Sequence, residues 1–130
     1  MKKGHKKPLK ILVVEDDPDI LNELNIALAS IGFDVDVLQS GKPILQNQFV
    51  VPDLIILDKR LPDIDGLEIC KYLKSRPNYQ QIPVIVLSAG SVVSSKAIES
   101  GASRFVEKPF VMQELVKAIK ETLHLPEPRH

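Results

Sequence analysis

The sequence predicts an α/β fold in which five strand-and-helix pairs build one parallel sheet. Short apolar runs of strand length, beginning with Leu9–Val14, alternate along the chain with amphipathic segments of helical period. Strands that alternate with helices indicate a parallel sheet with right-handed crossovers and helices on both faces. The 130 residues, 44% hydrophobic and 26% charged, fit one globular domain with a single core.

Most of the expected strands are almost continuously apolar, as strands buried on both faces are. The exception is residues 33–38, where apolar and acidic residues alternate. This alternation predicts one exposed face and a place near a sheet edge. The five expected strands are Leu9–Val14, Phe33–Leu38, Leu54–Leu57, Val84–Leu87 and Arg104–Val106.

The helices are predicted from their periodicity and from signals at their ends. Asp17 is a good N-cap and Pro18 suits a first helical turn, so a helix is expected to begin there and to end at Gly32. A clear amphipathic helix follows Pro109. The other segments are a weak helix at 42–48, a helix at Leu67–Lys74 and an ambiguous stretch at 91–100, whose serines and valines are poor helix formers.

The composition favours a cytoplasmic protein. Seventeen basic and 17 acidic residues give zero net charge, so no broad attraction to nucleic acid or membrane is expected. The single cysteine, Cys70, excludes an internal disulfide, indicates a reducing compartment, and lies on an apolar helix face where a core position is expected. The apolar run at 9–14 is too short for a signal peptide or membrane span. Residues 1–8 are expected to form a basic flexible tail, 9–124 the domain and 125–130 a C-terminal tail.

Polar side chains follow four of the five expected strands. In open α/β sheets, ligands bind at the carboxyl ends of the strands, so these side chains are expected to share one cleft. They are Glu15, Asp16 and Asp17 after the first strand, Asp58 after the third, Ser88 after the fourth, and Glu107 and Lys108 after the fifth.

These residue types suit phosphoryl chemistry assisted by a metal. The crowded carboxylates of Asp16, Asp17 and Asp58 need a cation to stay ionised, and hard oxygen ligands indicate Mg²⁺ or Mn²⁺. Lys108 and Ser88 can then contact the phosphoryl oxygens while Asp58 acts as the nucleophile. Singly, each residue is explained as well by a turn, a cap or a solvated position, and for Asp17 a helix cap fits very well. Their joint placement favours the shared site.

Four motifs, in this order, resemble the receiver domain of two-component response regulators over roughly residues 9–123. They are Ile-Leu-Val-Val-Glu-Asp-Asp-Pro at 11–18, Leu-Ile-Ile-Leu-Asp-Lys-Arg-Leu-Pro-Asp-Ile-Asp-Gly at 54–66, Val-Ile-Val-Leu-Ser-Ala at 84–89 and Phe-Val-Glu-Lys-Pro-Phe at 105–110. The resemblance implies a flavodoxin-like, doubly wound five-stranded parallel sheet of order 2-1-3-4-5.

The resemblance also implies a role for each matching residue. It assigns the metal-binding acid pair to Asp16 and Asp17, the phosphorylated aspartate to Asp58, a metal-binding backbone carbonyl to Arg60, the switch hydroxyl to Ser88, the switch aromatic to Phe105 and the phosphate-pairing lysine to Lys108. It further implies a cis peptide bond at Lys108-Pro109.

The implied function is that of a phosphoacceptor in a two-component system or phosphorelay. A histidine kinase or histidine phosphotransfer protein donates the phosphoryl group to Asp58, and a separate output protein reads the face formed by residues 91–100, the fifth strand and the last helix. The module is expected to be a signalling protein and not an enzyme, although self-phosphorylation from small donors and self-dephosphorylation are expected. Residues 91–100 are expected to be the most mobile part and to become ordered on activation.

Three features depart from the family pattern. The stretch from Ser88 to Lys108 is about two residues shorter than usual, so the fourth helix is expected to be short or displaced. Lys59 and Arg60 place two positive charges directly after Asp58. No output domain follows the last helix, which leaves a stand-alone receiver and an excised fragment as alternatives.

Three other functions stay open. One is an interaction module of the same fold that no longer depends on phosphorylation; the intact acids, Ser88 and Lys108 argue against it. A flavin-binding protein would need a phosphate-cradling loop after the first strand, where this chain has Glu-Asp-Asp-Pro. A hydrolase that uses Asp58 as its nucleophile would need a second carboxylate two residues on, where this chain has Arg60.

Overall fold

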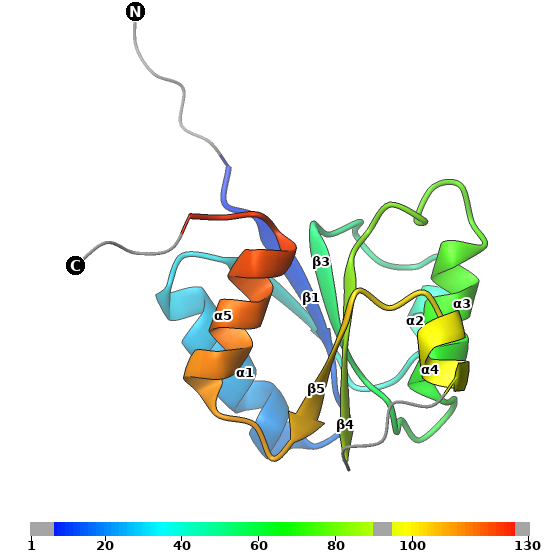
Figure 1. Cartoon of the computed structure of the whole chain (residues 1–130), viewed down its shortest axis with the longest axis horizontal. Coiled ribbons are helices and arrows are strands. Elements are labelled where there is room, and N and C mark those ends of the chain that lie inside the picture. The colour runs from blue at the N-terminus through cyan, green and yellow to red at the C-terminus, as the bar shows by residue number, and fades with distance from the viewer. Residues whose placement is uncertain (1–6, 90–94, 127–130) are drawn as a thin grey trace, which may run out of the picture.

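The computed structural model describes residues 7–89 and 95–126, which form a five-stranded parallel sheet with helices on both faces (Figure 1). The strand order β2-β1-β3-β4-β5 confirms the order implied by the resemblance. The strands are β1 (Lys10–Val14), β2 (Asp34–Leu38), β3 (Leu54–Asp58), β4 (Val84–Ala89) and β5 (Arg104–Lys108). The helices are α1 (Pro18–Ser30), α2 (Lys42–Leu45), α3 (Gly66–Lys74), α4 (Ser95–Glu99) and α5 (Met112–Thr122).

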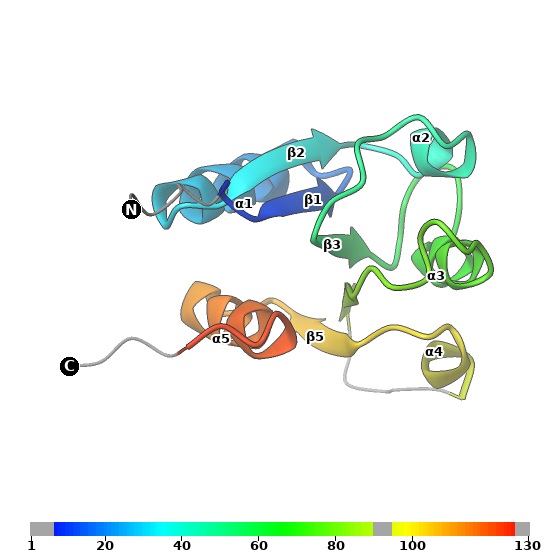
Figure 2. The ribbon, with the colours of Figure 1, turned by 90° about the horizontal axis from the view of Figure 1, so that it is seen from above.

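The helices form two layers, one on each face of the sheet. Figure 2 shows α1 and α5 on one side, and α2, α3 and α4 on the other. Alternate side chains of the central strands supply both cores: Ile11 and Val13 pack with α1 and α5, whereas Leu12 and Val14 pack with α2 and α3. The unbroken apolar runs of β1 and β3 are therefore explained by burial on both faces.

β2 is an edge strand, as its alternating sequence predicts. Among the strands that the structure describes, it pairs with β1 alone, and Asp34 and Val37 are exposed. At its start, Lys10 Nζ lies 2.8 Å from Asp34 Oδ2 and 3.3 Å from Asp36 Oδ2. These cross-strand charges favour the pairing of β1 with β2 at the rim of the sheet.

The helix signals near residue 17 and near Cys70 are confirmed. Asp17 Oδ1 accepts hydrogen bonds from the main-chain N–H groups of Asp19 and Ile20, at 2.9 and 3.3 Å, so Asp17 caps α1. Gly32 follows the end of α1 with a φ of +105°, a conformation that L side chains rarely adopt. Cys70 is fully buried, and this burial raises the pKa of its thiol.

α2 is shorter than its sequence segment, and α4 is described only in part of its segment. α2 ends at Leu45, and Asn47, which takes a positive φ of 58°, stops it from continuing to residue 48. In the ambiguous segment the structure describes only residues 95–100, where α4 has five residues. Residues 90–94 lie outside the described residues, so the expected mobility of that stretch stays a prediction. Most of the two expected tails, residues 1–6 and 127–130, also lies outside the described residues, so the expected tails stay predictions.

The Lys108-Pro109 peptide bond is cis, as the resemblance implies. Within residues 7–89 and 95–126, no helix has the length and apolar character that a membrane span requires.

Candidate functional site

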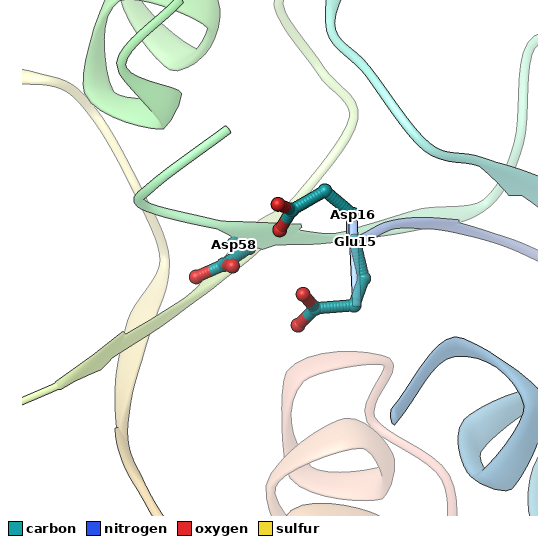
Figure 3. Close-up of side chains that lie close together, drawn as sticks. All are labelled: Glu15, Asp16 and Asp58. Carbon is teal, nitrogen blue, oxygen red and sulfur yellow. The ribbon is translucent and has the colours of Figure 1, made fainter. Parts of the chain in front are cut away.

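Three carboxylates meet where β1 and β3 end. β1 and β3 pair in parallel with Val14 opposite Leu57, so the residues that follow Val14 lie beside Asp58, the last residue of β3. One oxygen each of Glu15, Asp16 and Asp58 lies within 4.8 Å of the others. In Figure 3, Glu15 and Asp16 both extend from the end of β1 toward the side on which Asp58 lies.

Two of these carboxylates are removed from solvent. Glu15 is 0% exposed and Asp58 is 4% exposed, whereas Asp16 lies at the surface. The pKa of Glu15 is raised from 4.5 to about 7, chiefly by burial and with a contribution from Asp58. The main-chain N–H of Asp17 and the charge of Lys108 act in the opposite direction. A divalent cation in this cluster would favour the ionised form of Glu15.

Lys108 joins the cluster from the end of β5. Its Nζ lies 3.3 Å from Glu15 Oε1 and 3.3 Å from Asp58 Oδ2. Burial opposes the charged form of Lys108, but the charges and hydrogen bonds of Asp58 and Glu15 outweigh it, and the pKa of Lys108 is raised. The sequence-based expectation that Lys108 lies beside Asp58 is met.

The donor set fits a hard divalent cation. All three groups offer carboxylate oxygens, which are the ligands that Mg²⁺ and Mn²⁺ prefer. When all four groups are ionised, three negative charges face the one positive charge of Lys108, so the cluster gains from two more positive charges. Exposed Asp16 keeps one side of the cluster open to solvent.

Asp17 is not among the carboxylates that the structure brings together. Its side chain caps α1, and its main-chain N–H donates to Glu15 Oε2 at 3.1 Å. The resemblance assigns the metal-binding pair to Asp16 and Asp17, whereas the structure groups Glu15 and Asp16 with Asp58. The cap has a physical reason: Pro18 begins the helix, so the carboxylate before it satisfies the first free N–H groups of that helix.

The loop between β3 and α3 places Arg60 against Asp58. The main-chain N–H of Arg60 lies 3.4 Å from Asp58 Oδ1, and Arg60 forms a short antiparallel bridge with Asp65. Gly66 N–H donates to Lys59 O at 2.6 Å. A Cβ at Gly66 would collide with the main chain of Asp58, so this close approach requires glycine.

Comparison with known proteins decides the family. The response regulator receiver domain family matches residues 11–120. The chain belongs to this family. As a receiver domain it is a signalling module of two-component systems, and its sheet order and strand-end acids agree with that membership.

The relatives of this receiver domain include transcriptional regulators. The phosphate regulon transcriptional regulatory protein PhoB of Rhizobium meliloti is 36% identical over 122 residues, which cover 92% of this chain and 54% of PhoB. Transcriptional regulatory protein PrrA of Mycobacterium leprae is 38% identical, over 88% of this chain and 49% of PrrA. The chain thus spans about half the length of these relatives.

Solved receiver domains have the same fold. The receiver domain of a signal transduction histidine kinase from Syntrophus aciditrophicus matches with a TM-score of 0.82 and 32% identity, covering 89% of this chain and 90% of that one. The receiver domain of a sensor histidine kinase from Pseudomonas aeruginosa matches with a TM-score of 0.80 and 25% identity, over 90% and 98%. The latter holds a magnesium ion in its active-site cleft.

The two residues expected to act as a switch lie on neighbouring strands of this receiver domain. Ser88 is next to Leu87, the residue that pairs with Asp58, so its half-buried side chain belongs to the strand beside the acid cluster. Phe105 pairs with Val86 and packs, partly buried, against the core beneath α3 and α4. Ser88 in β4 and Phe105 in β5 therefore lie on two strands that pair directly with each other.

Proposed function

We propose that Asp58 is the phosphoacceptor of this receiver domain. The observation that carries the proposal is a buried Asp58 carboxylate held 3.3 Å from Lys108 and grouped with Glu15 and Asp16 at one edge of the sheet. Titratable groups whose pKa values are shifted by burial and by charged neighbours cluster at functional sites, and Asp58 lies among such groups, Glu15 and Lys108.

The reaction is a phosphoryl transfer to a carboxylate oxygen. An oxygen of Asp58 forms the new O–P bond, and the bond between phosphorus and the donor breaks. The electron pair of that bond leaves with the donor, which is the imidazole nitrogen of a phosphohistidine or the acyl oxygen of a small acyl phosphate. Lys108 neutralises charge on the transferred oxygens, and Ser88 donates a hydrogen bond to one of them.

The residues that would hold Mg²⁺ are Glu15, Asp16 and Asp58, with the backbone carbonyl of Arg60 as a fourth oxygen. Bound there, the ion would supply positive charge to phosphoryl oxygens as negative charge develops on them. Glu15 takes the place of Asp17 in this set because Glu15 contacts both the cluster and Lys108. The glutamate side chain is the longer one, and it reaches the cleft from the residue that directly follows β1.

The proposed partners follow from the chemistry. A histidine kinase or histidine phosphotransfer protein supplies the phosphoryl group, and a separate output protein reads the face formed by α4, β5 and α5. Movement of Ser88 toward the phosphoryl group and of Phe105 into the space behind it would connect Asp58 to that face. Self-phosphorylation from small donors and self-dephosphorylation belong to the same proposal, and the cytoplasm is the proposed location.

Intact mass spectrometry tests the assignment. The protein is incubated with acetyl phosphate and Mg²⁺, alongside Asp58→Asn, in which the reacting oxygen is replaced by an amide. We expect one phosphoryl adduct on the wild-type protein that chelation of the metal abolishes, and none on the variant. Equal labelling of Asp58→Asn would show that another residue accepts the group.

A further inference from the structure

The β3–α3 loop, residues 59–65, is fixed at its base by its own main chain. Gly66 N–H donates to Lys59 O, and Arg60 pairs with Asp65 across the loop. Asp65 also caps α3, because its Oδ1 accepts from Leu67 N–H at 2.8 Å. These bonds fix the two ends of the loop, next to β3 and α3. They do not involve its middle, where Asp63 and Ile64 lie.

The middle of the loop is held by a contact with a different loop. Asp63 Oδ1 accepts a hydrogen bond of 3.0 Å from the main-chain N–H of Gly41, the residue before α2. Ile64 beside it is half-buried against the core under α2 and α3. Gly41 is buried, and a Cβ there would overlap with side-chain atoms of Ile69 and Ile64. The two loops are thus closely packed at position 41, where a larger residue would have to displace these side chains.

Asp63 is absent from the acid cluster that the structure brings together, so any effect it has on Asp58 is indirect. Within residues 7–89 and 95–126, no ion pair of Asp63 occurs, and its hydrogen bond to Gly41 is its one side-chain contact of that kind. The same loop carries Arg60, whose main-chain N–H lies 3.4 Å from the Asp58 carboxylate. The bond of Asp63 to Gly41 therefore adds a second restraint on this loop, beside the pairing of Arg60 with Asp65 at its base.

We propose that Asp63 is a positioning residue, which holds the Arg60 main chain against Asp58 through its hydrogen bond to Gly41. The proposal rests on the proposed function of Asp58. A loop ordered in advance loses less conformational entropy when a metal or phosphoryl group binds. Supporting groups around a metal site change metal affinity by about 10–100-fold when they are removed.

The chain offers two variants that isolate this bond and one matched control. Asp63→Ala removes the acceptor, whereas Asp63→Asn keeps an Oδ1 that accepts from Gly41 and removes only the charge. Asp53→Ala is the control, because Asp53 Oδ2 accepts from Lys10 N–H at 2.7 Å before the amino end of β3. It removes the same kind of bond at the opposite end of β3 from Asp58.

The experiment measures Mg²⁺ affinity by calorimetry and the Mg²⁺ dependence of labelling by acetyl phosphate. We expect Asp63→Ala to weaken Mg²⁺ binding about tenfold, with the labelling rate restored at saturating Mg²⁺. Asp63→Asn and Asp53→Ala should stay within about twofold of the wild type. Thermal unfolding of each variant checks that it is folded under the assay conditions.

Wild-type affinity in Asp63→Ala would overturn the proposal, and so would an equal loss in Asp63→Asn, since the charge and not the hydrogen bond would then be responsible. A labelling rate that stays low at saturating Mg²⁺ would contradict a positioning role as well. These outcomes differ from failure of the proposed function, in which the wild-type protein itself shows no Mg²⁺-dependent labelling.

Discussion

Glu15 and Asp17 are two residues apart in the chain, and their carboxylates have different neighbours. Glu15 is buried beside Asp58 and Lys108, whereas Asp17 is exposed and accepts from the first N–H groups of α1. Glu15→Gln should weaken Mg²⁺ binding by at least about tenfold, because even supporting groups around a metal have effects of that size. Calorimetric titration of the metal measures this change.

Asp17→Ala is the matched comparison at the residue scale. It should lower the free energy of unfolding by about 1 kcal/mol, the usual cost of losing an N-cap, and leave Mg²⁺ affinity within about twofold of wild type. Asp17→Ser, which keeps a capping oxygen, should recover most of the stability. If Asp17→Ala abolished metal binding while Glu15→Gln did not, the proposed ligand set would be wrong.

The proposed metal site contains Glu15 where the resemblance implies Asp17, and this difference shows which part of the site the sequence alone did not predict. One rule, that polar residues after parallel strands share an edge, predicts the proximity of Asp16, Asp58 and Lys108 that the structure shows. The structure shows the Asp17 side chain as the cap of α1, and the metal titrations decide between Asp17 and Glu15 as a ligand. Asp17-Pro18 already carries the signal of a helix start, which commits that side chain to the cap and leaves Glu15 and Asp16 for the cleft.

At the scale of elements, α1 has one buried and one exposed side, and its residues test which side faces the sheet. Leu24 is 0% exposed and Ile26 is 61% exposed, two positions apart on the same helix. Leu24→Ala should lower the free energy of unfolding by about 2–5 kcal/mol through the cavity it leaves. Ile26→Ala should change it by about 0.5 kcal/mol or less.

Chemical denaturation of both variants measures the difference. Similar losses at the two positions would mean that α1 packs with a different face against β1 and β3.

The predictability of each element follows from how much local signal it carries. β1, β3 and β4 are buried runs with a turn or cap signal beside them, and their expected positions agree with the structure to within two residues. α4 has no strong apolar period, although Gly101, with a φ of +88°, lies just beyond its end, and it spans five residues in the described part of that segment. Its position depends on tertiary packing, in which buried Ala97 joins the core under α3.

At the scale of the whole molecule, the proposed switch extends from Asp58 across β4 and β5 to α4. Beryllofluoride, which mimics a phosphoryl group on a carboxylate, should slow amide hydrogen exchange both near Asp58 and in residues 95–108. The physical reason is that an inward Ser88 and Phe105 would tie β5 and α4 more firmly to the sheet. Hydrogen exchange read by mass spectrometry gives the change for each peptide.

The Asp58→Asn variant is the control for that measurement, since it lacks the carboxylate that binds the mimic. Protection confined to the surroundings of Asp58, with residues 95–108 exchanging at the same rate in both states, would mean that no such switch operates.

The central claim is that Asp58, and no other carboxylate, accepts the phosphoryl group in a Mg²⁺-dependent reaction, because of the groups that surround it at the carboxyl ends of the strands. The most direct measurement is to treat the protein with acetyl phosphate and Mg²⁺, reduce the product with borohydride, and sequence its peptides by tandem mass spectrometry. Borohydride converts an aspartyl phosphate to homoserine, so the label marks the reacting residue. The account predicts homoserine at position 58 alone, and none when the metal is chelated. Homoserine at another aspartate, or equal conversion at position 58 without metal, would contradict it.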